Sequence, residues 1–435
     1  MLRIFSALFF LSISIFPALA FTITPVKSPG GIEAWLVEDK SVPLISMQFS
    51  FHGGAAGDPE GKQGLANFMT AMMDEGAGDL TSQEFQKAEE EIAMRMSYSA
   101  DDDRFTSTFQ TLSANREEAF RLLSLAVNAP RFDDEPLERM RAQLLLMLAQ
   151  SQEDPNAIAM QALQQKALGD HPYARDLQGT TESLKSITAL DLHKLHQRLF
   201  ARDNLHIAVV GDIDAENLGR LLDETFGKLP EKSAMPVITD TTAFTQSDIV
   251  VIDRDIPQSV IYFAMPGMKR SDPDFITAYV MNMILGGGGF GSRLMEEVRE
   301  KRGLSYSVWS DLYPLEKGGL ILGGAATRNE KAAETIAIIK DQIAQFAKQG
   351  PSAEELADVK TYMTGSYPLR FASGRGTTSQ LLGIQEENLG LDYVEKRNSL
   401  IEAVTLQDIK RVAQRLLSEK PMLFVVVGKP EGLKN

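Results

Sequence analysis

The segment Glu296–Ser310, EEVREKRGLSYSVWS, contains the side chains best suited to chemistry in this sequence of 435 residues. Arg299 and Tyr306 lie where a predicted helix passes through Gly303 into a predicted strand. A guanidinium has a permanent charge and a phenol is a hydrogen-bond donor, so the pair could stabilise an oxyanion. The alternative is structural, with Arg299 paired to an adjacent glutamate and Tyr306 packed on a sheet. The residues alone favour this second arrangement, because exposed arginines near glutamates are common.

A glycine-rich stretch, LGGGGFG, precedes this segment and has the spacing G-x-G-x-x-G at Gly286, Gly288 and Gly291. A dinucleotide-binding fingerprint follows a strand, whereas the residues before this stretch, DPDFITAYVMNMIL, predict a helix. Ser292 and Arg293 also stand where a phosphate-binding loop would have Lys and then Ser or Thr. We therefore interpret the stretch as a flexible loop between two helices.

Metal ligands are scarce, because the chain has no cysteine and only five histidines. His193 and His196 are three residues apart on a predicted helix, but no acidic residue of another motif is placed to complete a zinc site. We interpret this pair as solvated surface residues, and His206, inside an apolar strand, as a satisfied core residue. The residues alone provide no convincing metal centre.

Residues 1–20 predict export from the cell. Arg3 is followed by an apolar run broken by serines, and then by Ala18-Leu19-Ala20, the small-residue pattern of a signal-peptide cleavage site. The run is short for a bilayer span, and no later stretch approaches that length, so no integral membrane segment is expected after cleavage. A formal net charge of −15 argues against nucleic acid as a partner. The lack of cysteine excludes disulfides.

The sequence matches itself, which indicates a duplicated domain. Residues 187–213 resemble residues 404–430, and identical residues such as Thr188 and Thr405 are 217 positions apart. Earlier in each half the offset is 214. The predicted organisation is a signal peptide at 1–20, homologous domains at 21–228 and 247–435, and a linker without helical periodicity at 229–246.

Strand and helix patterns alternate within each half. Runs such as PLISMQFSF and LHIAVVG predict strands, and NREEAFRLLSLAVN predicts a helix. Adjacent strands followed by runs of helices favour an α+β domain with helices on one face of a mainly antiparallel sheet. The stretch Gln63–Gly78, QGLANFMTAMMDEGAG, also predicts a helix, yet its centre, Asn67–Ala71, offers no acid, base or metal ligand.

The duplicated halves, the glycine-rich stretch and the motifs REKRGLSYSV, HPYARDLQGT and NLHIAVVGD together resemble the pitrilysin family of zinc metallopeptidases, the inverzincins. The resemblance covers nearly the whole chain after residue 20 and is greatest to short bacterial members, whose active unit is a pair of two-domain chains. It implies two homologous α+β domains of the kind found in processing peptidases.

The resemblance also implies that the zinc site is lost. The catalytic helix of the family reads H-x-x-E-H within GLAHFLEHM, and this chain has GLANFMTAM in the same frame. Asn67, Thr70 and Ala71 stand at the first histidine, the glutamate and the second histidine, and Leu148 stands at the third ligand. None of these four side chains is a good zinc ligand. This chain is therefore expected to bind no cofactor, and zinc is expected in a partner chain.

The resemblance gives other residues a role in binding the substrate. In the family, an arginine and a tyrosine seven residues later contact the substrate and the tetrahedral intermediate, and Arg299 and Tyr306 have this spacing. The resemblance therefore reverses the preference stated above and favours a catalytic role in trans for this pair. Five glycines match the position of a loop implicated in substrate capture in non-catalytic subunits of processing peptidases. They are Gly286, Gly287, Gly288, Gly289 and Gly291.

The leading hypothesis is a non-catalytic subunit of an exported zinc metallopeptidase, inactive alone and located in a bacterial periplasm. It would pair with a homologous catalytic chain that has an intact H-x-x-E-H motif, and enclose a peptide or unfolded protein. One alternative is a catalytically inert peptide-binding or scaffold protein of the same fold. Another is a peptidase that uses an unrecognised site in this chain.

Overall fold

A computed structural model describes residues 21–433 of the chain, which form two β-sheets from successive parts of the sequence. The signal-peptide prediction concerns residues 1–20 and lies outside the described residues. The strands of the first sheet are β1 (Thr24–Lys27), β2 (Glu33–Glu38), β3 (Leu44–His52), β4 (Arg95–Ala100), β5 (Arg104–Leu112) and β6 (Leu205–Gly211). The strands of the second sheet are β7 (Asp248–Asp253), β8 (Gln258–Pro266), β9 (Ser305–Leu315), β10 (Gly318–Arg328) and β11 (Leu423–Gly428).

The second sheet repeats the topology of five strands of the first, and β1 has no counterpart in it. The strand orders of the two sheets are β1-β2-β6-β3-β5-β4 and β7-β11-β8-β10-β9, so β4 and β9 are equivalent edge strands. The pairings are antiparallel except for β2 with β6 and β7 with β11, which are parallel. The predicted α+β class with mainly antiparallel sheets is confirmed.

Most of the chain outside the sheets is helical. The α-helices between β1 and β7 are α1 (Leu65–Thr70), α2 (Ser82–Glu91), α3 (Arg116–Asn128), α4 (Asp134–Ser151), α5 (Pro155–Leu168), α6 (Thr181–Ser186), α7 (Ala189–Leu199) and α8 (Ala215–Phe226). Those after β7 are α9 (Phe275–Asn282), α10 (Ala332–Gln349), α11 (Ala353–Gly365), α12 (Gly374–Glu386), α13 (Tyr393–Ala403) and α14 (Leu406–Leu417). Shorter helical segments used below are η5 (Met283–Gly287), η6 (Gly289–Gly291), η7 (Met295–Glu300) and η9 (Tyr367–Phe371).

The repeat detected in the sequence is a capped helix followed by a buried strand, α7 with β6 and α14 with β11. Each helix begins with the same capping box, formed by Thr188 with Asp191 or by Thr405 with Asp408. The threonine hydroxyl accepts from the backbone N–H of the aspartate, and the aspartate carboxylate accepts from the backbone N–H of the threonine. The identical caps explain why this part of the repeat is readable in the sequence.

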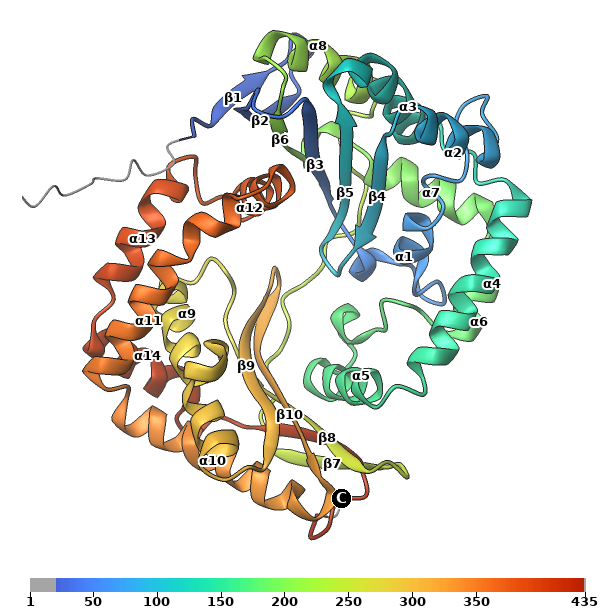
Figure 1. The fold of residues 1–435 in the computed structure, drawn as a ribbon. Coiled ribbons are helices and arrows are strands. Elements are labelled where there is room, and N and C mark those ends of the chain that lie inside the picture. Colours follow the sequence, from blue (N-terminus) through green and yellow to red (C-terminus); the bar gives the residue numbers. More distant parts are fainter. Residues whose placement is uncertain (1–20, 434–435) are drawn as a thin grey trace, which may run out of the picture.

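The two sheets lie toward the middle of the molecule, and most helices lie around them toward the outside (Figure 1). Alternate residues of β3, including Phe49 and Phe51, point into an apolar core shared with α3 and α8. On the second sheet, Phe263 of β8 and Phe424 of β11 enter the equivalent core beneath α9, α10 and α14. Large buried aromatic side chains therefore fix the helical layer of each sheet.

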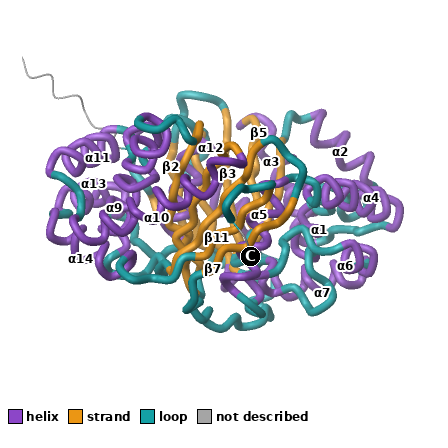
Figure 2. Tube along the Cα trace, turned by 90° about the horizontal axis from the view of Figure 1, so that it is seen from below, coloured by secondary structure: helices purple, strands orange, loops and turns teal. Residues whose placement is uncertain are grey.

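Two helices are exchanged between the halves (Figure 2). α5 packs on the second sheet, where Leu163 joins a core with Val425 and Val427 of β11. α12 packs on the first sheet, where Leu381 lies in a core with Val210 of β6. The expectation of helices on one face only is therefore incomplete, because each sheet is also covered on its second face by a helix of the other half.

The segment that connects the sheets, residues 228–247, contains no helix or strand. Its middle part contacts both halves, since Met235 packs against the first core and the backbone N–H of Thr241 donates to Lys317 O at 2.7 Å. The domain and linker boundaries named from the sequence stay a prediction.

Candidate functional site

The stretch expected to form the catalytic helix forms only a short one. α1 spans Leu65–Thr70, and residues 71–75 form turns, so the expectation of a helix through Gln63–Gly78 is wrong. The helix starts after Gly64, whose φ of 87° suits glycine. Asp58 holds this start, because its carboxylate accepts from the backbone N–H groups of Leu65 at 2.9 Å and Ala66 at 3.1 Å. Burial raises the pKa of Asp58 to about 7, against the effect of these hydrogen bonds.

The residues at the zinc-ligand positions do not fit a zinc ion. Thr70 Oγ1 donates to the backbone carbonyl of Asn67 at 2.6 Å, and Ala71 has no donor atom. Leu148 of α4 is 2% exposed and belongs to the apolar core that also contains Phe68 of α1. Zinc in proteins is bound by imidazole nitrogen, thiolate sulfur or carboxylate oxygen, and these four side chains supply none of the three. Nowhere in residues 21–433 do three His, Asp or Glu side chains converge to hold a metal.

Arg299 and Tyr306 lie together at the junction between η7 and β9. The guanidinium carbon of Arg299 lies 4.8 Å from the centre of the Tyr306 ring. Gly303, with a φ of 60°, forms the turn between the two elements. Tyr306 is 81% exposed, so it does not pack on the sheet, whereas Arg299 does lie 3.5 Å from Glu300 Oε1. The structural alternative is thus half correct, and the catalytic role of the pair stays a prediction.

The glycine-rich stretch is helical rather than a flexible loop. Gly286 and Gly287 end η5, a π-helical continuation of α9, and Gly289 and Gly291 lie in η6. Gly286 needs its lack of a side chain, because a Cβ there would lie 2.6 Å from the backbone nitrogen of Ser310 in β9. This close approach forms one wall of a cavity of about 590 Å³ beside β9. The capture role of the five predicted glycines stays a prediction.

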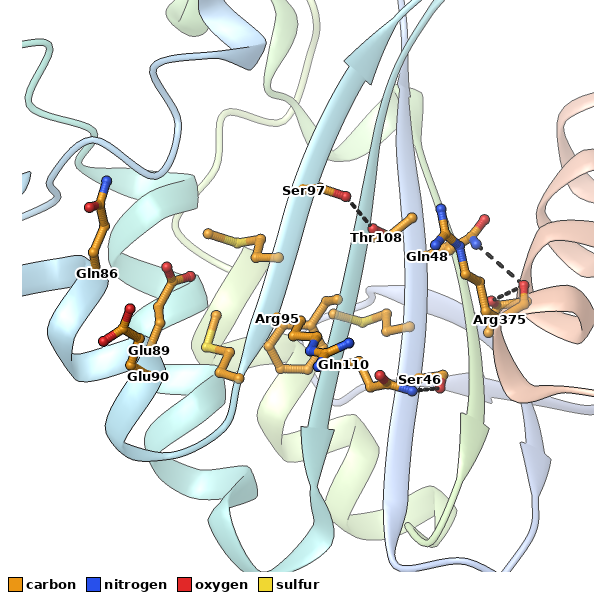
Figure 3. Close-up of a pocket in the computed structure, with 15 residues that line it drawn as sticks. Ser46, Gln48, Gln86, Glu89, Glu90, Arg95, Ser97, Thr108, Gln110 and Arg375 are labelled. Atoms are coloured by element: carbon orange, nitrogen blue, oxygen red, sulfur yellow. Dashed lines mark hydrogen bonds between the residues drawn. The ribbon is translucent and has the colours of Figure 1, made fainter. Parts of the chain in front are cut away.

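A second cavity, of about 540 Å³, lies at the free edge of β4 (Figure 3). Its sheet wall is polar, as Figure 3 shows for Ser97 of β4 and Thr108 of β5, whose hydroxyls are 2.6 Å apart. α12 closes one side, where Gln48 Nε2 donates to Arg375 O at 3.3 Å. The cavity therefore offers hydrogen-bonding groups beside an edge strand that has no partner strand on one side.

Glu89 of α2 lies in the wall of this cavity and is the most perturbed carboxyl group near it. Burial, together with the Asp74 carboxylate, raises the pKa of Glu89 to about 8. Burial also raises the pKa of Asp74. Sequence reasoning missed Glu89, because nothing in EEEIAMRM distinguishes it from Glu90 and Glu91, and only the fold brings it near Asp74.

The histidines occupy different environments from those expected. His196 is half-buried, its Nε2 lies 2.8 Å from Val127 O, and burial lowers its pKa. His193 packs edge-on against Phe132 with ring centres 4.9 Å apart, so the pair is not a solvated surface feature. His206 lies on the face of β6 opposite the main core, in a cavity shared with His52, and is not a core residue.

Comparison with known families decides the identity of the fold. A model of the insulinase domain (peptidase family M16) matches residues 35–181, and a model of the peptidase M16 inactive domain matches residues 186–363. The chain belongs to the M16 peptidase family. The recognition from sequence of a pitrilysin-like, duplicated peptidase fold is confirmed.

Individual relatives differ in what their names say about activity. The chain is 26% identical over 395 residues to a non-peptidase homolog, YmxG, of Helicobacter pylori, with 90% of each protein covered. It is 23% identical over 415 residues to an uncharacterized zinc protease of Streptomyces coelicolor, with 93% of this chain and 89% of the relative covered. Names of M16 relatives therefore include both peptidases and non-peptidases.

Solved structures give the same fold. A peptidase M16 inactive domain from Pseudomonas fluorescens is 29% identical and superimposes with a TM-score of 0.89, covering 95% of this chain and 99% of that one. The periplasmic protease PqqL of Escherichia coli is 16% identical with a TM-score of 0.80, covering 94% of this chain and 45% of that one. Together with the unsuitable ligand positions, the similarity to proteins named as a non-peptidase homolog and as an inactive domain fits a non-catalytic role for this M16 chain.

Proposed function

We propose that this chain is the non-catalytic subunit of an exported zinc metallopeptidase. The proposal rests on one contrast. The four zinc-ligand positions are occupied by unsuitable residues, Asn67, Thr70, Ala71 and Leu148. Arg299 and Tyr306, however, are present and contact each other, and the ring of Tyr306 is exposed to solvent. An exposed phenol beside a guanidinium can donate to an oxyanion in a partner's site.

The proposed assembly pairs this chain with a homologous catalytic chain that has an intact H-x-x-E-H motif and binds zinc. A peptide or unfolded protein is enclosed between the two chains. The pattern of residues 1–20 supports export to a bacterial periplasm, where the name of one structural neighbour places a protease of this fold. None of the helices in residues 21–433 combines the length and apolarity needed to cross a bilayer.

The test is peptide cleavage by a mixture of this chain and the catalytic chain. Addition of this chain should raise turnover, and Arg299→Ala or Tyr306→Phe should lower kcat by about 10²-fold, the effect of removing one oxyanion donor. KM should rise by a smaller factor, because the pair contacts the substrate as well but binds the transition state more strongly. Arg302→Ala is the matched control, since Arg302 lies on the same turn but pairs with Glu297 at 2.6 Å.

The competing function is that of an inert scaffold, and the same experiment distinguishes it from a role in catalysis. A scaffold would form the pair stably and leave kcat unchanged in the Arg299 and Tyr306 variants. A peptidase site within this chain would instead show as cleavage by the purified chain alone.

A further inference from the structure

Three arginines gather around one cavity of about 350 Å³ between α9, β9, η9, α12 and α13. They are Arg270, which follows β8, Arg370 in η9, and Arg397 in α13. Tyrosines accompany all three: Tyr279, Tyr367 and Tyr393 line the same cavity. We call Arg270, Arg370 and Arg397 the arginine cluster.

Arg397 is the buried member of the arginine cluster. It is 6% exposed, and its guanidinium carbon lies 4.1 Å from the centre of the Tyr367 ring. Its hydrogen bonds go to neutral oxygens, Met363 O and Asn398 Oδ1, both at 3.1 Å. A buried guanidinium is normally paired with an anion, because removing its charge from water is unfavourable. Burial lowers the pKa of Arg397, and the charge of Arg370 adds to this effect.

The other two members also contact aromatic or phenolic groups rather than acids. Arg270 lies over the Phe275 ring at 4.3 Å and donates to Tyr393 OH at 3.1 Å. Arg370 donates to Tyr279 OH at 3.4 Å and is exposed. Within the described residues, no carboxylate oxygen lies within 4.0 Å of a side-chain nitrogen of the cluster. This is notable in a chain with 59 acidic and 44 basic residues.

Two acids line the same cavity, and neither neutralises the cluster. Glu387 pairs with Arg104 across the two halves at 3.0 Å. Asp311 of β9 is exposed to solvent, and it forms no ion pair with a member of the cluster. The arginines of the cluster therefore line the cavity without a direct ion pair to either acid.

The cavity is the middle one of three that follow β9. The cavity beside the glycine-rich stretch, of about 590 Å³, contacts Ser307 to Asp311 and shares Arg370 and Arg397 with the middle one. A third, of about 400 Å³, contacts Pro314 to Glu316 and shares Arg270. Cavities strung along one strand suit an extended chain better than a compact anion such as free phosphate.

We infer that the arginine cluster is a subsite for a carboxylate of a peptide that lies along β9. Arginine matches a carboxylate with paired hydrogen bonds, and the low exposure of Arg397 strengthens the attraction. The carboxylate comes from an acidic side chain or from the peptide's C-terminus. The inference deepens the proposed function, on which it rests, by giving the enclosed substrate an acidic anchor.

The test measures binding of short peptides with an uncharged fluorophore to the purified chain by fluorescence anisotropy. One peptide carries a central Glu and a C-terminal amide, the second has Gln in place of that Glu, and the third has Gln with a free C-terminal carboxylate. At least one carboxylate peptide should bind about tenfold more tightly than the neutral one, as expected for a charge-assisted hydrogen bond. The first and third peptides distinguish a side-chain from a terminal carboxylate.

The decisive variant is Arg370→Gln, because Arg370 is exposed and its replacement leaves the core intact. It should abolish the preference for the carboxylate peptide. Arg328→Gln, at an exposed position on β10, is the control of equal charge change and should preserve it. Equal binding of all three peptides, or equal loss in both variants, would overturn the inference. The inference would also be overturned if inorganic phosphate displaced the labelled peptides and bound more tightly than any carboxylate peptide.

This outcome is separable from that of the proposed function. If the chain shows no preference for carboxylate peptides, the turnover assay with the Arg299 and Tyr306 variants still tests the proposed function. Carboxylate binding without any effect of this chain on a catalytic partner would support the subsite and refute the role in catalysis.

Discussion

Replacing Glu89 by Gln should change how the stability of this protein depends on pH. The pKa of Glu89 is raised from 4.5 to about 8, first by burial and then by Asp74. Between these two pH values the folded chain therefore holds a proton that the unfolded chain releases. With respect to this group, the free energy of unfolding is highest below pH 4.5 and falls as the pH rises toward 8.

The size of this loss follows from the two pKa values. If the whole difference between the two pKa values acted on stability, the free energy of unfolding would fall by about 5 kcal/mol, which is an upper bound. Because Glu89 is only half-buried, solvent screens the carboxylate, and we expect about 1–2 kcal/mol between pH 5 and pH 8. Gln cannot ionise, so the variant should lack this part of the loss. At pH 5 the two proteins should be within about 0.5 kcal/mol of each other.

Urea unfolding of the wild type and of Glu89→Gln, at pH 5 and at pH 8, measures the effect directly. The variant should be the more stable protein at pH 8 only. Glu90→Gln is the matched control, because Glu90 is the exposed neighbour on the same helix and should change stability equally at both values. A Glu89 variant that behaves like the Glu90 variant would refute the assignment of a buried, protonated carboxyl. Asp58 and Asp102, whose pKa values burial also raises to about 7, contribute equally to both proteins and cancel in the difference.

Two further predictions concern the glycine-rich stretch and the former zinc positions. Gly286→Ala should destabilise the chain by about 1–3 kcal/mol in urea unfolding, because the new Cβ meets the backbone of β9, whereas Gly291→Ala, with no atom within 4 Å, should be tolerated. Equal effects would show that the stretch does not pack as described. A variant with Asn67→His, Thr70→Glu and Ala71→His should hold well under one zinc per chain after dialysis, because the third ligand position is still apolar. Stoichiometric zinc by elemental analysis would contradict that expectation.

The sequence predicts the architecture of each half well, because duplication and strand patterns are local signals. The helix–strand repeat is readable since Thr188 and Thr405 cap equivalent helices. The exchange of α5 and α12 could not be predicted in this way. Apolar residues such as Leu163 and Leu381 indicate that a helix is buried, but their spacing does not say which sheet it covers.

The sequence was less informative about the sites. The unsuitable zinc ligands could be found because the motif has a fixed spacing, although the helix is shorter than expected. The arginine cluster could not be predicted from the sequence, because its three members are far apart in the chain. Only the packing of η9 and α13 beside β9 brings Arg270, Arg370 and Arg397 to one cavity. The interpretation of His193 and His196 failed for a related reason, since α3 and the loop that follows it cover a face of α7 that helical spacing alone leaves open.

The contrast between the two kinds of site bears on what the chain does. At the former zinc site, Leu148 has become part of the core, so that region contributes packing. Beside β9, by contrast, Arg397 is buried without a carboxylate partner. Replacing such a buried charged group with an apolar residue of similar size often increases the stability of the fold. A protein that served only as a scaffold would gain from such a replacement at no loss of function. Arginines without a carboxylate partner therefore favour a chain that binds a ligand, and under the proposed function the exposed Tyr306 at the start of the same strand would contact a ligand shared with a partner.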